Sequence, residues 1–375
     1  MTDIYRMKKQ KKILEDICIN NGITPKSTIG LFMPPNFNEI REVKEVLKFF
    51  SSPYCQLDIN LTYKELCEKV NEFKLELIFT MKEYTESIHE ILWSCPSLKN
   101  VILLDSDRII TKKNKLMNSK LWEMVSINAH DEIATGAWIN SYTRELFSAD
   151  EMAEYSDNAL LKLKPYLNSE AKVLEIGCSS GITMYKISPF TKLYCAIDIS
   201  KNAIEKNKQI SKKLNIKNIE LHVLSADMIE EISHTEFDII IINSVVQLFH
   251  SYEYLRDVIC GCIKKMKNKG VIFIGDIMDL DLKEDFELSL SSFKKSNPQY
   301  DTKLYFENEL FIPKRFFKCI ESDFKQISEF MISPKIHTLK NELTEYRYDC
   351  LIIIDKNIDE DNHNHRMVQA VNIFN

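Results

Sequence analysis

The most constraining feature of the sequence is an apolar segment, 172–176, that runs directly into a turn with two glycines. The turn reads Gly-Cys-Ser-Ser-Gly at 177–181, and a helical pattern follows it. Strand-like and helical segments then alternate up to about residue 274. Parallel strands need helical crossovers of this kind. We therefore expect a doubly wound, Rossmann-like α/β sheet in this part of the chain.

The rest of the chain is expected to form a second domain and two appendages. Residues 1–115 also alternate between strand and helix patterns, which predicts a smaller α/β domain. A polar stretch at 105–120 is expected to link it to a larger domain at 121–355. Within the larger domain, residues 278–321 form an insert rich in charged and aromatic side chains. The polar residues 356–375 are expected to form a flexible tail.

The strands of the larger domain can be placed from their apolar runs. We expect them at 172–176, 192–197, 219–224, 237–242, 271–274, 325–330 and 348–354. Short strands separated by helical segments are typical of a mostly parallel sheet.

The composition excludes several classes of function. The 375 residues carry a net charge of −6 at pH 7, which disfavours a nucleic-acid partner. No apolar run approaches the roughly 18 residues needed to cross a bilayer, and the N-terminus has no apolar signal core. We therefore expect a cytoplasmic protein without membrane association. The 10 cysteines include no Cys-x-x-Cys pair, and no metal site is expected.

The glycine turn has the residues of a cofactor site. Gly177 and Gly181 lack a Cβ, so the backbone can bend tightly there and approach a ligand. A dinucleotide site would use Gly-x-Gly-x-x-Gly, whose amides face a pyrophosphate, and the spacing here differs. Glu175 would repel a phosphate but suits the α-ammonium of S-adenosylmethionine. A nicotinamide-dependent oxidoreductase is therefore disfavoured, and Cys178 is expected to contact S-adenosylmethionine.

A second acid, Asp198, ends the next expected strand. An acid about 20 residues after such a turn can bind the ribose hydroxyls of an adenosine. Ile199 follows it in the same loop. The combination of Glu175, the glycine turn and Asp198 is a more specific signal than any single glycine, because an ordinary turn would explain a single glycine.

Two further loops are expected at the carboxyl edge of the sheet, where such sheets bind ligands. Ala226, Asp227 and Met228 follow the third strand, and an acid there can reach the adenine amino group. Asp227 is explained almost as well as a helix N-cap. Asn243 and Ser244 follow the fourth strand, and a buried Asn243 would need hydrogen-bond partners.

Together these segments resemble the class I S-adenosylmethionine methyltransferases. More narrowly, they are similar to the methyltransferase domains embedded in nonribosomal peptide synthetases. The resemblance covers about 121–355 and rests on Ile-Asn-Ser-Val-Val-Gln at 242–247 and Ile-Gly-Asp-Ile-Met at 274–278. Its most specific part is Asn-Glu-Leu-Thr-Glu-Tyr-Arg-Tyr at 341–348, a signature in which Thr replaces Ser. Ser179 departs from the family, which usually has a middle glycine there.

The signature supplies candidates for catalysis. Glu342 could take a proton from the acceptor or hold its amine, and Arg347 could anchor a substrate carbonyl. A structural ion pair between these two explains them equally well. Tyr346 is the third candidate from the signature. His250 and His337 could each contact substrate, although a surface or packing role is somewhat more common for such a histidine.

Two aromatic residues upstream also resemble the lead-in of the embedded domains. Trp138 and Tyr142 could close over the cofactor, and they suit a plain core role equally well. Tyr142 is therefore included among the expected cofactor contacts.

The segment 1–115 has a resemblance of its own. The phrases at 29–35, 57–61 and 77–80 look like the opening of an adenylation domain. The Ser/Thr/Gly-rich phosphate loop of that family is missing. The resemblance therefore implies that this segment is a non-catalytic remnant, which either stabilises the methyltransferase domain or binds a partner protein.

The chemistry of methyl transfer narrows the expected substrate. The donor is already activated, so the site must mainly align the acceptor and exclude water. An α-amino group, with a pKa of about 7.7–8.0, needs no strong base, whereas a hydroxyl or carbon acid does. We therefore expect N-methylation of an amino acid or peptidyl group in nonribosomal-peptide-type secondary metabolism. The substrate would be a small molecule or tethered to a carrier protein.

Two alternatives stay open. One is an O- or C-methyltransferase that acts on a free metabolite. The other is a non-catalytic partner of a synthetase or carrier protein that binds S-adenosylmethionine without chemistry. The intact acids and glycines around 175–198 argue against such decay.

Overall fold

The computed structural model describes residues 24–357, apart from short gaps at 36–37, 85–87, 89–90, 92–94, 96, 99, 105–108, 111–114, 307–308 and 322. The chain divides into two compact units. Unit 1 comprises the residues up to 113 together with 250–253, and unit 2 comprises 114–249 and the residues from 254 onward. Of the expected tail, residues 358–375 lie outside the described part of the chain.

Unit 1 is a five-stranded sheet with helices on its two faces. The strand order is β2-β1-β3-β4-β5, and every pair is parallel except β4 with β5. Its elements are β1 (Ile29–Phe32), α2 (Asn38–Phe49), β2 (Tyr54–Leu57), α3 (Tyr63–Glu72), β3 (Leu77–Thr80), β4 (Asn100–Leu103) and β5 (Ile109–Ile110).

The alternation of side chains along these strands gives unit 1 two apolar layers. Leu31 and Phe79 face the layer that contains α2, whereas Phe32 and Ile78 face the layer that contains α3. Helix α3 begins at a capping box, in which the Thr62 hydroxyl accepts from the backbone of Glu65 and the Glu65 carboxylate accepts from the backbone of Thr62.

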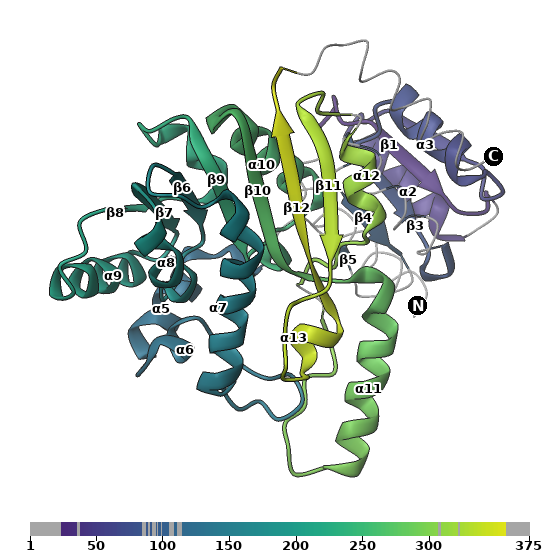
Figure 1. Cartoon of the computed structure of the whole chain (residues 1–375). Helices are drawn as coiled ribbons and strands as arrows, with labels where there is room; N and C mark the ends of the chain where they lie inside the picture. The colour runs from purple at the N-terminus through teal and green to yellow at the C-terminus, as the bar shows by residue number, and fades with distance from the viewer. Residues whose placement is uncertain are drawn as a thin grey trace. The chain divides into compact units, whose positions relative to one another are not determined.

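Unit 2 contains the larger sheet, which runs through the centre of Figure 1. Its elements before the fourth sheet strand are α5 (Ser119–Asn128), α6 (Glu132–Thr135), α7 (Ala149–Leu163), β6 (Lys172–Ile176), α8 (Ile182–Ile187), β7 (Leu193–Asp198), α9 (Lys201–Lys213) and β8 (Ile219–Val223). The remaining elements are β9 (Phe237–Asn243), α10 (Tyr252–Lys265), β10 (Met266–Met278), α11 (Lys283–Ser296), α12 (Arg315–Glu321), β11 (Ile327–Ser333), α13 (Glu342–Glu345) and β12 (Arg347–Asp355).

The strand order of unit 2 confirms the predicted fold class. Seven strands lie in the order β11-β12-β10-β9-β6-β7-β8. The pairs from β10 to β8 are parallel, and β12 is antiparallel to both of its neighbours. The order reverses between β6 and β9, because the chain runs outward from β6 through β7 to β8 and then returns to β9. Ligands bind at such a switch point in open α/β sheets.

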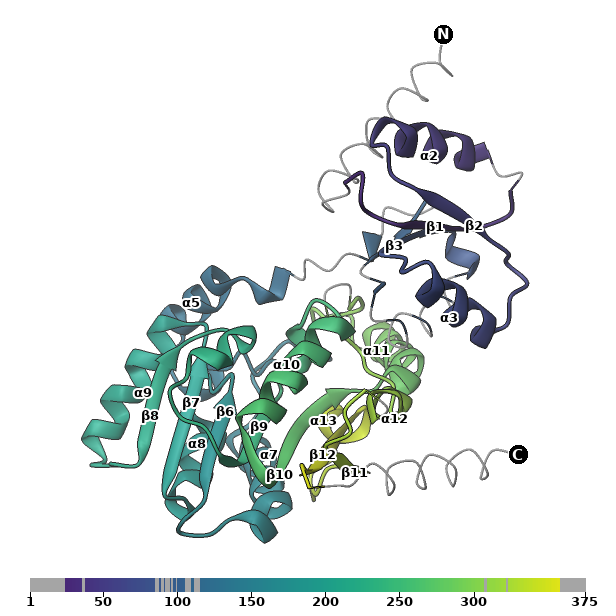
Figure 2. The same cartoon turned by 90° about the horizontal axis from the view of Figure 1, so that it is seen from above.

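Helices cover both faces of this sheet. Ala159 and Leu163 of α7 pack with α8 against the strand residues Val173, Ile239 and Phe273, all of which are buried. Figure 2 shows α10 on the opposite face from α7 and α8. Burial on both faces explains why the central strands are unbroken apolar runs such as Ile-Ile-Ile-Ile at 239–242.

The structure differs from the expected strands in a few places. β10 begins at Met266, because Met266 pairs with Phe237 of β9 and Lys269 pairs with Asp355 of β12, even though this segment lacks an apolar pattern. β11 lies at 327–333 rather than 325–330. β2 was not predicted, and β5 falls within the stretch that was expected to be a linker. Both are short strands whose formation depends on pairing.

Candidate active site

A pocket lies at the switch point of the larger sheet. It is lined by the carboxyl ends of β6, β7 and β9, represented by Glu175, Asp198 and Asn243. Segments before α7 and after β8 complete its walls. The pocket holds about 1070 Å³ of empty space, including its open mouth. This is the scale of pockets that hold whole cofactors.

The glycine turn forms the floor of this pocket. Gly177 adopts φ +78°, and a Cβ there would come within 2.5 Å of the Val245 side chain. The loops after β6 and β9 can therefore approach each other only with glycine at 177. Ser179 adopts φ 43°, a left-handed conformation that favours the glycine found there in related domains. The turn is thus built for close approach to a ligand.

Glu175 is a buried acid at the edge of the pocket. Its side chain is 3% exposed, and Tyr194 donates a hydrogen bond of 3.0 Å to its Oε2. Burial raises the pKa of Glu175 to about 8, and the nearby Asp198 contributes to the rise. A positively charged ligand beside this carboxyl would relieve the cost of ionising it.

Asp198 is held in place by backbone amides. Its Oδ2 accepts from the N–H of Ser179, and its Oδ1 accepts from the N–H of Ser200, both at 2.8 Å. The side chain is 9% exposed, and burial raises its pKa. Each carboxylate oxygen keeps a second lone pair that can accept from a ligand. The geometry suits two hydroxyls on neighbouring carbons, as in a ribose.

These donor and acceptor positions fit S-adenosylmethionine. Glu175 would hold the ammonium group, Asp198 would hold the ribose, and Leu224, Ala226 and Phe249 offer an apolar wall for the adenine. When bound, this cofactor supplies a methyl group on a positively charged sulfur. The pocket lining contains two acids and no lysine, arginine or histidine among the described residues, so it favours a ligand with positive charge.

The structure places eight of the twelve expected cofactor contacts in the pocket lining. They are Glu175, Gly177, Cys178, Asp198, Ile199, Ala226, Asn243 and Ser244. Asn243 is 6% exposed; its Nδ2 donates to Thr183 Oγ1 at 3.3 Å, while its Oδ1 is buried without a partner among the described residues.

The other four expected contacts do not line the pocket. Gly181 adopts φ +83° as the N-cap of α8. Asp227 is exposed and accepts a 2.9 Å hydrogen bond from Tyr254, which does line the pocket. Met228 is 38% exposed. Tyr142 instead packs against Phe286 in an aromatic cluster with the insert.

One wall of the pocket was not predicted from the sequence. It is formed by the segment around α5 and α6, including Leu116, Met117, Trp122, Ser126, Thr135 and Gly136. Glu123 of α5 accepts from the Ser200 hydroxyl at 2.9 Å and from the N–H of Asn202 at 3.0 Å. It therefore fastens α5 to the first turn of α9, beside Asp198. Trp138, an expected lining residue, is present in the pocket.

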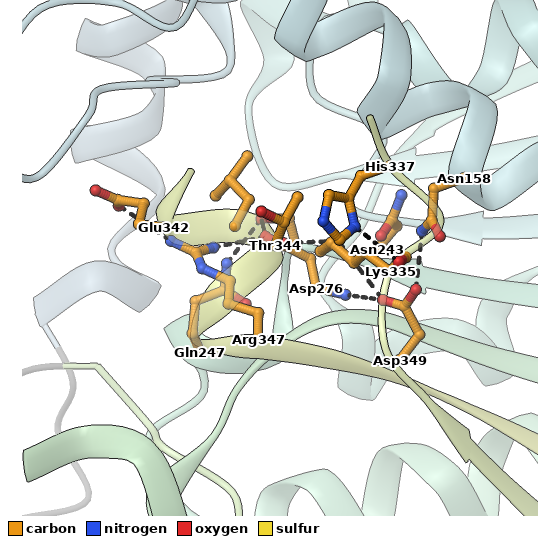
Figure 3. A network of polar contacts seen from close by, with 12 residues as sticks. Asn158, Asn243, Gln247, Asp276, Lys335, His337, Glu342, Thr344, Arg347 and Asp349 are labelled. Carbon is orange, nitrogen blue, oxygen red and sulfur yellow. Dashed lines mark hydrogen bonds and ion pairs between the residues drawn. The ribbon is translucent and has the colours of Figure 1, made fainter. Parts of the chain in front are cut away.

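A second set of polar residues lies at the ends of β10 and β12. We call it the charge network and define it as Lys162, Asp276, Lys335, Glu342, Arg347 and Asp349, most of which Figure 3 shows in contact. Arg347 bonds Asp276 at 2.6 Å and lies 3.6 Å from Glu342. Glu342 also accepts from the backbone and hydroxyl of Ser141 at 2.7 and 2.8 Å. The signature residues Glu342 and Arg347 are thus partners in an ion pair.

Asp276 joins the charge network to the pocket. It is fully buried, and its Oδ2 accepts a 2.6 Å hydrogen bond from the hydroxyl of Ser244, which lines the pocket. The positive charges of Arg347 and Lys335 offset its burial and lower its pKa to about 2. Asp276, at the register shift within β10, and Ser244, directly after β9, adopt φ 61° and 58°, a conformation that is costly for these residues.

Asp349 ties helix α7 to the sheet. It accepts from Asn158 at 2.8 Å and from Lys162 at 2.6 Å, and it also accepts from the N–H of Asp276. Nothing in the sequence pairs these residues, which are up to 191 positions apart. The spacing of Asn158 and Lys162 on one face of α7 was the only available signal.

The remaining catalytic candidates lie apart from the pocket lining. Tyr346 stacks on Phe286, with ring centroids 4.5 Å apart. His250 does not line the pocket, and its Nδ1 lies 3.2 Å from the hydroxyl of Ser251. His337 accompanies Lys335 on the loop before α13, where its Nδ1 is 3.0 Å from the Lys335 carbonyl.

Neither a metal site nor a membrane-spanning helix is present among the described residues. No group of three His, Cys, Asp or Glu side chains is placed to hold a metal ion. No helix in this part of the chain is long and apolar enough to cross a membrane.

Comparison with known proteins agrees with the fold and the pocket. Residues 167–351 match the model of a family described as "Methyltransferase domain". This range contains the whole sheet from β6 to the middle of β12. Residues 167–351 are thus similar to a methyltransferase domain, and the pocket at the switch point of their sheet suits S-adenosylmethionine as its cofactor.

Its similar sequences are parts of very large synthetases. The chain is 34% identical over 221 residues to chondramide synthase of Chondromyces crocatus, which covers 56% of this chain and 6% of that protein. It is 28% identical over 254 residues to cyclosporin synthetase of Tolypocladium inflatum, covering 64% of this chain and 2% of that protein. The chain therefore spans only a small part of the length of these relatives, and other similar proteins are named as nonribosomal peptide synthetases, such as one of Penicillium thymicola that is 27% identical over 230 residues.

Similarity to solved structures is more distant. An N-methyltransferase of Bradyrhizobium japonicum, in complex with S-adenosyl-L-homocysteine, aligns with a TM-score of 0.43 and 14% identity. The alignment covers 64% of this chain and 98% of that chain.

Proposed function

We propose that this protein N-methylates the amino group of an aminoacyl or peptidyl intermediate of nonribosomal peptide synthesis, carried as a thioester on a carrier protein. The proposal combines the methyltransferase domain at 167–351 with the relatedness of this region to nonribosomal peptide synthetases. The nature of the ionisable groups around the pocket favours an amine over other acceptors.

The pocket offers little basic chemistry. Among the residues that the structure describes, neither a histidine nor a lysine lines it. Its ionisable side chains are Glu175, Asp198, Cys178, Tyr155 and Tyr254. Burial raises the pKa of the Cys178 thiol and the Tyr155 phenol well above their usual values, so neither is a base at neutral pH. An amine is the acceptor that needs no strong base, since much of it is neutral near pH 8.

Glu342 is poorly suited to be a free base. Its carboxylate already accepts two hydrogen bonds from Ser141 and pairs with Arg347. Burial raises the pKa of Glu342, while Arg347 and Ser141 oppose that rise. We therefore propose a structural role for Glu342 and Arg347. Arg347 pairs with Asp276, and Asp276 holds Ser244, which lines the pocket.

The test is transfer of a deuterated methyl group from S-adenosylmethionine to L-aminoacyl thioesters of N-acetylcysteamine. Tandem mass spectrometry would locate the label, and we expect it on the α-nitrogen. The matching 2-hydroxyacyl thioester is the control. A label on the oxygen of that control, without N-methylation, would instead identify an O-methyltransferase. Cofactor binding without transfer to any acceptor would favour the non-catalytic partner.

We further propose that unit 1 is a remnant of an adenylation domain without activity of its own. Its mostly parallel sheet is compatible with this origin, and the sequence lacks the phosphate loop that activation requires. Removing residues 1–115 should leave methylation of free aminoacyl thioesters intact but lower the rate with carrier-bound substrate. Equal loss of both rates would show that unit 1 supports the fold rather than a partner.

A further inference from the structure

Tyr155 lies where the cofactor pocket meets the charge network. It lines the pocket, and its ring lies 4.5 Å from that of Trp138, centroid to centroid, with the planes tilted by 59°. The ammonium of Lys335 lies 5.2 Å from the centre of the same ring. The charges of Asp276, Glu175, Asp349 and Arg347 all act on the phenol. Tyr155 is therefore close to both the cofactor pocket and the charge network.

The Tyr155 side chain borders the cofactor pocket and also a smaller pocket that it shares with Lys335 and His337. The side chain is 5% exposed, yet the hydroxyl has no hydrogen bond within the described residues. Buried tyrosine hydroxyls usually find a partner. Burial and the surrounding acids keep the phenol protonated, so the group can donate and accept hydrogen bonds but cannot remove a proton.

The position of Tyr155 is fixed by helix α7. Tyr155, Asn158 and Lys162 are spaced by three and four residues, which places them on one face of the helix. Asn158 and Lys162 bind Asp349 of β12, and Asn158 also accepts from the N–H of Ile336. These bonds set the rotation and height of α7 on the sheet. They therefore hold the Tyr155 ring at the edge of the pocket.

We propose that the Tyr155 hydroxyl binds the acceptor amine by accepting a hydrogen bond from its N–H. This inference rests on the proposed function and identifies the acceptor as a primary or secondary amine. When this hydrogen bond holds one N–H, the nitrogen lone pair can point in fewer directions, which favours its alignment with the methyl group. In the transfer, the nitrogen lone pair forms the new bond to the methyl carbon, the carbon–sulfur bond breaks with its electron pair left on sulfur, and the nitrogen then loses a proton to solvent.

The test compares Tyr155→Phe with the unchanged protein in two binding measurements. Calorimetry with S-adenosylhomocysteine reports the cofactor site. Titration of the S-adenosylhomocysteine complex with an L-aminoacyl thioester of N-acetylcysteamine, and with the matching acyl thioester that lacks the amine, reports the acceptor site. Tyr166→Phe, at a tyrosine that does not line the pocket, is the matched control. Steady-state kinetics with the same aminoacyl thioester would accompany the binding data.

We expect Tyr155→Phe to bind S-adenosylhomocysteine within about twofold of the unchanged protein. Its affinity for the aminoacyl thioester should fall roughly tenfold, as for loss of one buried hydrogen bond. Affinity for the amine-free thioester should not change, and KM for the acceptor should rise more than kcat falls. Retained cofactor binding shows that the variant is folded.

Three outcomes would overturn the proposal. Equal losses for the two thioesters would show that the hydroxyl does not sense the amine. A selective loss of S-adenosylhomocysteine affinity would assign the hydroxyl to the cofactor. Unaltered acceptor binding with normal N-methylation would remove Tyr155 from the site while leaving the proposed function intact. If the unchanged protein neither binds nor methylates any aminoacyl thioester, the proposed function itself fails.

Discussion

The two halves of the site are built in opposite ways. In the cofactor pocket, the two acids bind residues that are near in sequence: Glu175 and Tyr194 are 19 positions apart, as are Ser179 and Asp198. In the charge network, Ser141 and Glu342 are 201 positions apart, and Asn158 and Asp349 are 191 apart. The first half is a local motif, whereas the second exists only after the whole unit has folded.

The charge balance of the two halves differs as well. The pocket contains Glu175 and Asp198 without a lysine, arginine or histidine among its described lining residues. The charge network contains three acids (Asp276, Glu342, Asp349) and three bases (Lys162, Lys335, Arg347) in contact. The cofactor pocket therefore has an excess of acids, whereas the acids and bases of the charge network are equal in number. Substitutions should separate these roles.

The largest effect is expected from Asp276→Asn. The change removes the charge that faces Arg347 and Lys335 in a fully buried position, and an unpaired buried charge costs about 3–5 kcal/mol. Urea unfolding followed by tryptophan fluorescence would measure the loss of stability. Asp281→Asn, which breaks an exposed pair with Arg315, should cost less than about 1 kcal/mol. Equal costs for the two variants would show that the charge network is not structural.

Asp198→Ala should act on cofactor binding. It removes the carboxylate that would bind ribose and that orders the amides of Ser179 and Ser200. Hydrogen bonds to a charged group contribute about 1.5–3 kcal/mol, so calorimetry should show affinity for S-adenosylhomocysteine falling roughly 10- to 100-fold. Asp157→Ala, at an exposed acid paired with Lys186, is the control. Unchanged affinity in Asp198→Ala would contradict the assigned cofactor site.

Glu175 should make cofactor affinity depend on pH. Its pKa of about 8 in the free protein means that the carboxyl is mostly protonated at pH 7 and must lose that proton to bind an ammonium. Affinity for S-adenosylhomocysteine should therefore rise between pH 6 and pH 8, by at most about tenfold (1.4 kcal/mol) per pH unit. Calorimetry in buffers of different ionisation enthalpy should detect proton release from Glu175. A flat profile would contradict this assignment, and Glu175→Gln should lack this proton release.

The raised pKa of Glu175 also affects the free energy of unfolding, which should fall as pH rises while cofactor affinity increases. Between the ordinary carboxyl pKa and about 8, the folded protein keeps a proton on Glu175 that the unfolded chain has released. The contribution of this group is therefore fully present below the ordinary carboxyl pKa and is lost as pH rises through about 8. Stability without cofactor should fall across this window, and it should fall less in Glu175→Gln.

The smallest effect is expected from Glu123→Gln. Glu123 fastens α5 to the first turn of α9 through Ser200 and Asn202. Loss of its charge weakens both bonds but leaves an acceptor oxygen, so affinity for S-adenosylhomocysteine should fall about three- to tenfold. Glu205→Gln, at an exposed position on α9, should have no effect. Indistinguishable binding by these two variants would show that α5 is not held over the cofactor by Glu123.

The sequence was sufficient for the local features. Apolar runs such as 172–176 and 239–242 placed the central strands, because burial on both faces leaves an unbroken apolar pattern. The acids at 175 and 198 were found from their spacing around a glycine turn. The polar start of β10, at 267–269, was missed because its pairing with other strands overrides its composition.

The charge network could be predicted only in part from the sequence. The resemblance at 341–348 supplied Glu342 and Arg347, but no periodicity connects them with Asp276 or Lys335. The expected role of Tyr142 as a cofactor contact came from its position before α7, whereas its ring packs with the insert at Phe286 and Phe293. Contacts between distant segments are fixed by the packing of α7, β10 and β12. A single sequence contains no direct record of that packing.

The strand order also sets the moment at which the site is completed during synthesis. Every residue that lines the pocket has been made once the ribosome passes Tyr254. Arg347 and Asp349, which hold Asp276 and α7, arrive on β12, a strand that inserts between β10 and β11. A chain interrupted before β12 has the cofactor residues but leaves an edge of β10 unpaired and Tyr155 without its anchor. Insertion of β12 thus completes the anchoring of α7 and of Asp276.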